Sequence, residues 1–175
     1  MSGRAIMAIT LKEESILNEW TMMIDHGSGN AGTILAAIQA RLKEARIPGE
    51  CDWEVEEVKS SGFFAKVRRD FLIVNLREFS DYHMYIGIRD YGVHLDCCRF
   101  LTVEPGFLKK WASEKLTGYA DALSAPKNIL IHQDLRAWTT VVHHAVVGSV
   151  EDLMVKLGQD TKLLQRGSKG FLEIW

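Results

Sequence analysis

Residues Tyr82–Val103 alternate between apolar and polar side chains, and no other feature of the chain constrains the fold as strongly. A β-strand has a side-chain period of two, so alternate residues lie on opposite faces of a sheet. Two apolar sets follow this period, the first with Tyr82, Met84, Ile86 and Ile88, and the second with Val93, Leu95, Cys97, Leu101 and Val103. Arg99, between Cys97 and Leu101, is the one polar residue that interrupts them. We therefore expect a hairpin of two antiparallel strands with one buried face.

The loop of this hairpin must contain an even number of residues, because an odd number would mix buried and polar positions on one face. A loop of Tyr91–Gly92, or one of Asp90–Val93, meets this condition. Both loops predict the same cross-strand pairs, which are Arg89 with His94, Gly87 with Asp96, and Tyr85 with Cys98.

A helical period replaces the strand period in two other parts of the chain. After Asp134, a good N-cap residue, apolar side chains recur at helical spacing as far as Gly158, a good C-terminal stop. A second helix is expected from about Thr33 to Arg46. A shorter helix is expected after Pro105.

Further strands are expected at Trp53–Val58 and Phe71–Leu76. Together these elements predict an α+β fold, with a mainly antiparallel sheet of about four to six strands and two long amphipathic helices packed on one face. A length of 175 residues without internal repeats predicts a single domain over residues 1–175, with residues 1–12 as its flexible end.

Gly27, Gly29 and Gly32 have the G-x-G-x-x-G spacing of a dinucleotide-binding loop. In such a site the loop follows a strand and opens a helix whose N-terminal amides face a pyrophosphate. The preceding residues Trp20–Ile24 fit either a strand or a helix, and a helix would make Gly27 only its C-terminal stop. Because the spacing is common by chance, we favour a plain connector over a nucleotide or phosphate site. No cofactor is identified.

The other face of the predicted hairpin carries several titratable side chains, among them Tyr85, Arg89, His94 and Asp96. His94 oriented by Asp96 could act as an acid–base pair, with Arg89 holding a substrate anion. The same groups suit non-catalytic recognition of a partner protein or a small anionic ligand. Cross-strand charge pairs are also normal on a solvated sheet face. We favour binding, and keep a small-molecule enzyme as the alternative.

The overall charge gives no reason to expect nucleic acid or an anionic membrane surface as a partner. The net charge is -2 and the isoelectric point is near 6.3, whereas both partners demand clustered Lys and Arg. No run approaches the ~18 apolar residues of a membrane span. Homo-oligomerisation is left open.

Metal binding and disulfides are not expected from the histidines and cysteines. His143 and His144 are adjacent on the predicted helix, about 100° apart, and cannot face one ion; His143 lies at the border of the apolar stripe and His144 points to solvent. The cysteines Cys51, Cys97 and Cys98 are odd in number, and the adjacent pair cannot bridge without strain. We therefore expect reduced thiols and a cytoplasmic location.

Overall fold

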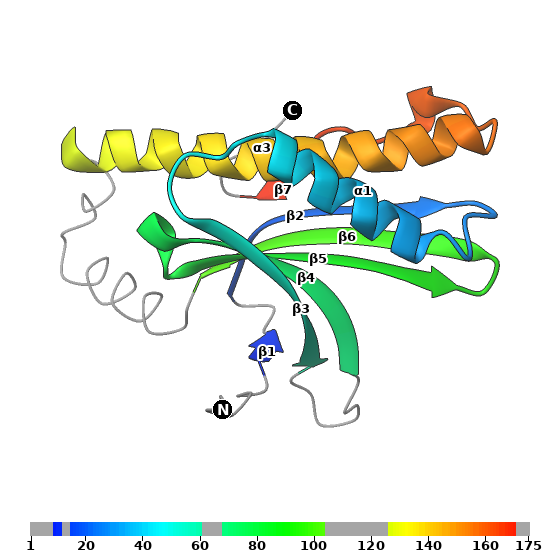
Figure 1. The fold of residues 1–175 in the computed structure, drawn as a ribbon, viewed down its shortest axis with the longest axis horizontal. Helices are drawn as coiled ribbons and strands as arrows, with labels where there is room; N and C mark the ends of the chain where they lie inside the picture. The colour runs from blue at the N-terminus through cyan, green and yellow to red at the C-terminus, as the bar shows by residue number, and fades with distance from the viewer. Residues whose placement is uncertain (1–8, 12–14, 61–67, 104–125, 171–175) are drawn as a thin grey trace.

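The computed structural model describes residues 9–11, 15–60, 68–103 and 126–170. These residues form a seven-stranded sheet, in the order β1-β3-β4-β5-β6-β2-β7, and two α-helices (Figure 1). The strands are β1 (Ile9–Leu11), β2 (Ile16–Ile24), β3 (Cys51–Ser60), β4 (Arg68–Leu76), β5 (Tyr82–Tyr91), β6 (His94–Val103) and β7 (Lys169–Gly170). All neighbours pair antiparallel except the short β1, which is parallel to β3. The α+β class and the mainly antiparallel sheet are therefore confirmed.

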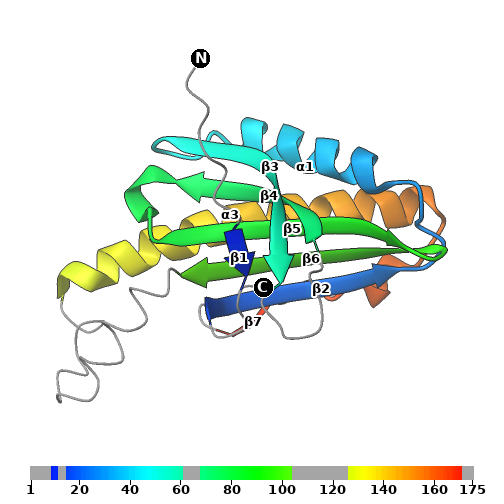
Figure 2. The same cartoon turned by 90° about the horizontal axis from the view of Figure 1, so that it is seen from below.

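The helices α1 (Ala31–Glu44) and α3 (Pro126–Lys156) both run over the upper side of the sheet in Figure 1, and Figure 2 shows the sheet from below. Arg41 of α1 joins the two helices, because its guanidinium lies 2.6 Å from a carboxylate oxygen of Asp152 in α3. The same guanidinium lies over Gly148, where a Cβ atom would come within 3.1 Å of it. We call the side of the sheet beneath the helices the covered face, and the other side the open face.

The main core lies between the covered face and the helices. The apolar stripe that predicted the last helix supplies Leu135, Trp138, Val142, Val146 and Val150 to it. Burial of each large apolar side chain contributes about 1.5–3 kcal/mol, so this stripe is what holds α3 on the sheet. The buried side chains that α1 and the strands add include Trp20, Ile24, Ile34, Ile38, Leu42, Leu72, Val74, Met84, Ile86, Leu95 and Leu101.

The last helix ends where the sequence predicts and begins earlier. Gly158 has a left-handed φ of 69°, and the N–H of the next residue, Gln159, donates to the carbonyl of Met154. Together with the bond from Gly158 N–H to Val155, this is a Schellman stop. The start is at Pro126 rather than after Asp134, because the helix extends beyond the apolar stripe that marked it in the sequence.

The hairpin of β5 and β6 keeps the predicted faces but not the predicted pairs. Arg89 lies opposite Asp96, Gly87 opposite Cys98, Tyr85 opposite Phe100 and Tyr91 opposite His94. The predicted pairing is therefore wrong by two residues, although its parity is right. The loop is Gly92-Val93, with Gly92 at a φ of 62°. A type II′ turn needs a positive φ at its first central position only, and glycine adopts it without strain.

The segment before the glycine motif is a strand. Trp20–Ile24 belongs to β2, which pairs with β6 along most of its length and with β7 at Asn18 and Glu19. The helical alternative is therefore wrong. The connection from β2 through α1 to β3 passes over β6, β5 and β4 before it re-enters the sheet.

Some predicted features fall on residues 1–8 and 104–125, which lie outside the described residues. They are the short helix after Pro105 and most of the predicted flexible end. Ile9–Leu11 of that end form β1. Among the described helices, none combines the length and the apolar character that crossing a membrane requires.

Candidate functional site

The middle of the open face is apolar rather than polar. Tyr85 is 5% exposed and packs edge-to-face against Phe71, with ring centroids 6.1 Å apart. Gly87 makes room for this packing, because a Cβ atom there would lie 2.7 Å from the Phe71 ring and 2.8 Å from the Cys98 sulfur. Val58 and Ile73 complete the buried group. The structure thus separates Tyr85 from the other predicted site residues and places it in a second, smaller core.

Arg89 and Asp96 form an ion pair across the hairpin, at the end of the open face near the β5–β6 turn. The Nε and Nη2 atoms of Arg89 both lie 2.8 Å from Oδ2 of Asp96, and both side chains are partly exposed. The guanidinium also lies over the ring of Tyr91, 5.1 Å from its centroid. The charge of Arg89 is therefore already balanced within the protein, which weakens it as a clamp for a substrate anion.

His94 faces a different carboxylate from the one that the acid–base hypothesis requires. Its Nδ1 atom lies 3.1 Å from Oδ1 of Asp25, at ion-pair distance but without the alignment of a hydrogen bond. The ring of His26 lies beside it, with centroids 6.1 Å apart. Asp96 is held by Arg89 instead. The structure brings His94 and Asp96 to one face but joins each to another residue.

Exposed apolar side chains surround these pairs. Met23 lies opposite Asp96 on the neighbouring strand and is 44% exposed, Tyr91 lies opposite His94 and is 58% exposed, and Val93 in the turn is 57% exposed. The hairpin-end surface is the name used below for Met23, Asp25, Arg89, Tyr91, Val93, His94 and Asp96. Parity identified Arg89, His94 and Asp96 in the sequence, whereas nothing in the alternation marked Met23, Asp25 and Tyr91 as part of this surface.

The glycine loop binds the hairpin through its own backbone. The N–H of Gly29 donates to a carboxylate oxygen of Asp90 at 2.9 Å, and the N–H of Ser28 donates to the carbonyl of Val93. Gly27 fits closely, since a Cβ atom there would lie 2.9 Å from Cβ of Leu95. The carboxylate of Asp90 thus takes one of the amides that a phosphate would use.

The surroundings of the glycine loop also differ from those of a dinucleotide site. A strand precedes the loop and a helix follows it, as such a site requires. However, β2 has antiparallel neighbours on both sides, whereas a dinucleotide site lies in a parallel sheet. Asp52, the acidic residue at the expected distance, opens β3 on the far side of three intervening strands.

A buried polar cluster beneath α3 is the feature that the sequence hypotheses missed. Arg99 is 0% exposed, and its guanidinium donates to the sulfur of Met84 and to the side-chain oxygen of Asn18. Its Nε atom has no hydrogen-bond partner, and no carboxylate in the described part of the chain pairs with it. Burial lowers the pKa of Arg99 to about 10, so it carries its charge at neutral pH. The break in the apolar pattern at Arg99 was the sequence signal for this cluster.

His143 belongs to the same cluster and is fully buried, not at the border of the apolar stripe. Its Nε2 atom lies 2.7 Å from the carbonyl of Arg166, so this nitrogen carries the ring proton, and its Nδ1 atom has no partner. Burial, aided by the nearby charge of Arg99, lowers the pKa of His143 to about 4. At neutral pH the ring is uncharged.

The segment Leu164–Ser168, which we call the strap, closes the cluster from the outside. The indole N–H of Trp20 donates to the carbonyl of Gln165, and the side-chain amide of Asn18 donates to the hydroxyl of Ser168. Leu164 is 6% exposed and joins the main core. The strap has no alternating or helical pattern, so the sequence held no signal for it.

The cysteines and the acidic side chains of β3 do not form a reactive site. Burial raises the pKa of the Cys51 thiol, raises that of Cys98 to about 11 and raises that of Cys97 further, so all three stay protonated. All three are free. Glu54 and Glu56 share a hydrogen bond that raises the pKa of Glu56. No group of three or more His, Cys, Asp or Glu in the described ranges could hold a metal ion.

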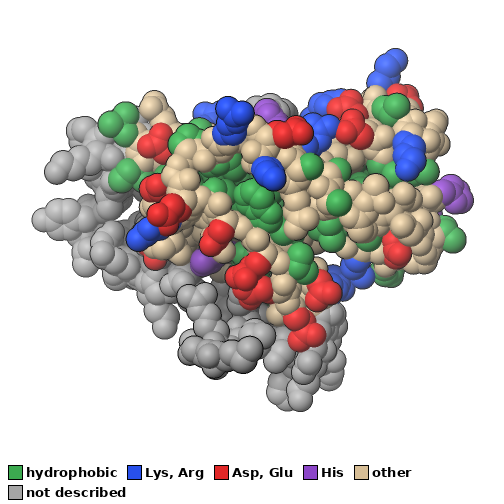
Figure 3. Space-filling model, viewed as in Figure 1, with side chains coloured by type: hydrophobic (Ala, Val, Ile, Leu, Met, Phe, Trp, Pro, Cys, Tyr) green, Lys and Arg blue, Asp and Glu red, His purple; other side chains and the backbone are tan. Residues whose placement is uncertain are grey.

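The acidic side chains of β3 have a structural explanation. β3 pairs with β1 only at its last three residues, so its remaining outer edge has no neighbour among the described strands. Asp52, Glu54, Glu56 and Glu57 lie along this strand, in the region where Figure 3 shows red side chains gathered below the middle. Charged side chains on a free edge disfavour pairing with strands of other molecules.

Comparison with protein-family models, with curated proteins and with solved structures found no match.

Proposed function

We propose that this protein is a non-catalytic cytosolic interaction domain that binds a partner protein through the hairpin-end surface. The observation that carries the proposal is the exposure of Met23 and Tyr91 around an ion pair that is already satisfied. Tyr, Met and Arg are enriched in the centres of protein interfaces, where burial of their side chains supplies most of the binding energy.

The charges of this surface favour a protein over a small anion. Asp96 balances Arg89, and the other carboxylate of the surface, Asp25, is 76% exposed beside the ring of His94. An anionic ligand would have to break the pair of Arg89 and Asp96. A partner with an apolar centre and a cationic rim could bind without breaking any contact.

The same contacts favour binding over the enzyme alternative. An acid–base pair needs its two groups within hydrogen-bond reach, whereas His94 faces Asp25 and Asp96 faces Arg89. A hollow among the described residues lies away from these pairs, on the strap. Exposed apolar side chains beside an ion pair that is already satisfied suit a macromolecular partner.

A photo-crosslinking amino acid at position 91 tests the proposal in cells. Val55 on β3 is the matched control position, because it is an apolar residue with a similar exposure of 53%. We expect a discrete cross-linked species from position 91 and none from position 55. A species of twice the mass of the chain would identify the partner as a second copy.

The variant Tyr91→Ser completes the test. In a chain without the cross-linking amino acid, this variant should no longer bind the species that was trapped from position 91. Truncation of a central aromatic anchor costs about 2 kcal/mol or more of binding energy. The variant Val55→Ser should leave capture unchanged. Equal cross-linking from both positions, or capture that survives Tyr91→Ser, would contradict the proposal.

A further inference from the structure

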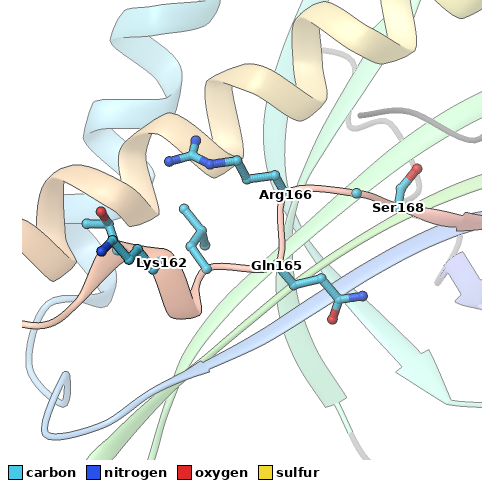
Figure 4. Close-up of a pocket in the computed structure, with 7 residues that line it drawn as sticks. Lys162, Gln165, Arg166 and Ser168 are labelled. Carbon is cyan, nitrogen blue, oxygen red and sulfur yellow. The ribbon is translucent and has the colours of Figure 1, made fainter.

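The outer side of the strap holds a hollow with a set of hydrogen-bond donors that nothing in the hairpin-end proposal uses. Its volume is about 580 Å³, within the usual range for small-molecule sites. It is lined by Thr161, Lys162, Leu164, Gln165, Arg166, Gly167 and Ser168. Figure 4 shows Arg166 reaching along α3 on one side, while Gln165 points the opposite way, over β2.

Two consecutive peptide groups of the strap have the same orientation. The carbonyls of Gln165 and Arg166 both point inward, because they accept from the buried side chains of Trp20 and His143. In a trans peptide the N–H points away from the carbonyl of the same plane, and the described chain has no cis peptide. The N–H groups of Arg166 and Gly167 therefore both point outward.

Neither of these N–H groups donates to an acceptor in the described part of the chain. Successive N–H groups on one side of a backbone form a concavity that binds anions. The inner side of the strap is filled by Trp20, Leu164 and His143, all buried. The two free donors thus face away from the core, and both of their residues line the hollow.

The charged side chains that line the hollow, Lys162 and Arg166, are both positive, while the carboxylate of the neighbouring Asp160 accepts from the backbone N–H of Lys162. Lys162 is exposed and has no ion-pair partner among the described residues. Arg166 is neutralised by Glu151, which it contacts through both terminal nitrogens. Behind the strap lies the unbalanced charge of Arg99, which is linked to the wall of the hollow through Asn18 and Ser168. A buried charge without a counter-ion attracts anions more strongly than an exposed one.

We propose that this hollow binds the phosphate group of a ligand, through the amides of Arg166 and Gly167 and the ammonium of Lys162. Backbone N–H groups combined with a lysine are a donor set that proteins use for phosphate. The volume leaves room for the remainder of a small phosphorylated molecule. The site is separate from the hairpin-end surface and does not depend on partner binding there.

Titration of the full-length ¹⁵N-labelled protein with inorganic phosphate at constant ionic strength tests this site. We expect saturable shifts at millimolar phosphate, largest for the amide resonances of Arg166 and Gly167. Lys162→Ala should weaken the apparent affinity about two- to fivefold, as expected for loss of one exposed ion pair. Lys43→Ala, which removes an exposed lysine of α1, should leave the affinity unchanged.

A second arm replaces inorganic phosphate by vesicles that contain phosphatidic acid. Broadening of the same two amides would support the site and identify a lipid headgroup as the source of the phosphate. A response to inorganic phosphate alone would support it and identify a soluble ligand. Shifts that grow without saturation, shifts centred on the glycine loop, or an equal loss of affinity in Lys43→Ala would overturn the proposal.

Discussion

Two arginines of neighbouring hairpin strands have opposite surroundings. Arg89 on β5 is partly exposed on the open face and has a carboxylate partner at 2.8 Å, whereas Arg99 on β6 is fully buried on the covered face and has only a sulfur and an amide oxygen. An ion pair near water changes stability little, whereas an unpaired buried charge is costly. The open face therefore holds a satisfied surface suited to docking. The covered face retains the cost of an unpaired buried charge, which a counter-ion would relieve.

The largest expected difference between the two regions is their response to acid. The folded pKa of His143, about 4, lies below its unfolded value of 6.5, so the unfolded chain binds a proton first as the pH falls. Stability from this group is complete above pH 6.5 and is lost as the pH falls toward 4. We expect a loss of about 2 kcal/mol between pH 7 and pH 5, measured by urea unfolding.

The control for this experiment is His143→Gln, whose side-chain N–H can still donate to the carbonyl of Arg166 but does not titrate. Its unfolding free energy should vary less over the same pH range. An unchanged pH dependence in this variant would show that the buried cluster does not set the acid sensitivity.

Replacement of the buried charge should stabilise the protein. Burial lowers the pKa of Arg99 from 12.5 to about 10, which corresponds to a cost of about 3 kcal/mol for its charged form. Arg99→Met keeps most of the volume and removes this cost, but also removes the hydrogen bond to the oxygen of Asn18, at about 1–3 kcal/mol. We expect a net gain of about 1 kcal/mol in urea unfolding at pH 7. A loss of stability would mean that the charge is balanced in the folded protein.

The pair of Arg89 and Asp96 should show a smaller coupling. A double-mutant cycle with Arg89→Met and Asp96→Ala is expected to give a coupling free energy of about 0.5–1 kcal/mol, because both groups keep contact with water. Added salt should reduce this coupling and leave the effect of Arg99→Met nearly unchanged. A coupling above about 2 kcal/mol would contradict the description of the hairpin-end surface as solvated.

The same contrast explains which features were predictable from the sequence. A strand period of two determines the face of each strand residue, so the open and covered sets were assigned correctly except for Val93, which was expected on the buried face but lies in the turn and is 57% exposed. It does not select among even loop lengths, and the register of Arg89 depended on the conformation of Gly92. The helical stripe after Asp134 was similarly sufficient to predict the buried side of α3, because its apolar side chains all face one sheet.

Features that depend on contacts between distant segments were not predictable. Trp20–Ile24 fits both periods, and pairing with β6 decided in favour of a strand. His143 is buried by the strap, which has no periodic pattern of its own. Arg99 was visible as an exception in the sequence, but its lack of a carboxylate partner depends on every element that packs around it.

The smallest expected effect concerns the contact that ties the glycine loop to the hairpin. Asp90→Ala removes the acceptor of the Gly29 amide, and since this bond is exposed we expect a loss of only about 0.5 kcal/mol in unfolding free energy. Hydrogen exchange of the Gly29 amide should become several-fold faster, while exchange of core amides changes little. Asp90→Asn keeps an oxygen acceptor and should preserve most of the protection. Because the variant frees the amide that a phosphate would use, a new phosphate-induced shift at Gly29 in Asp90→Ala would show that the loop is a latent anion site and not a connector.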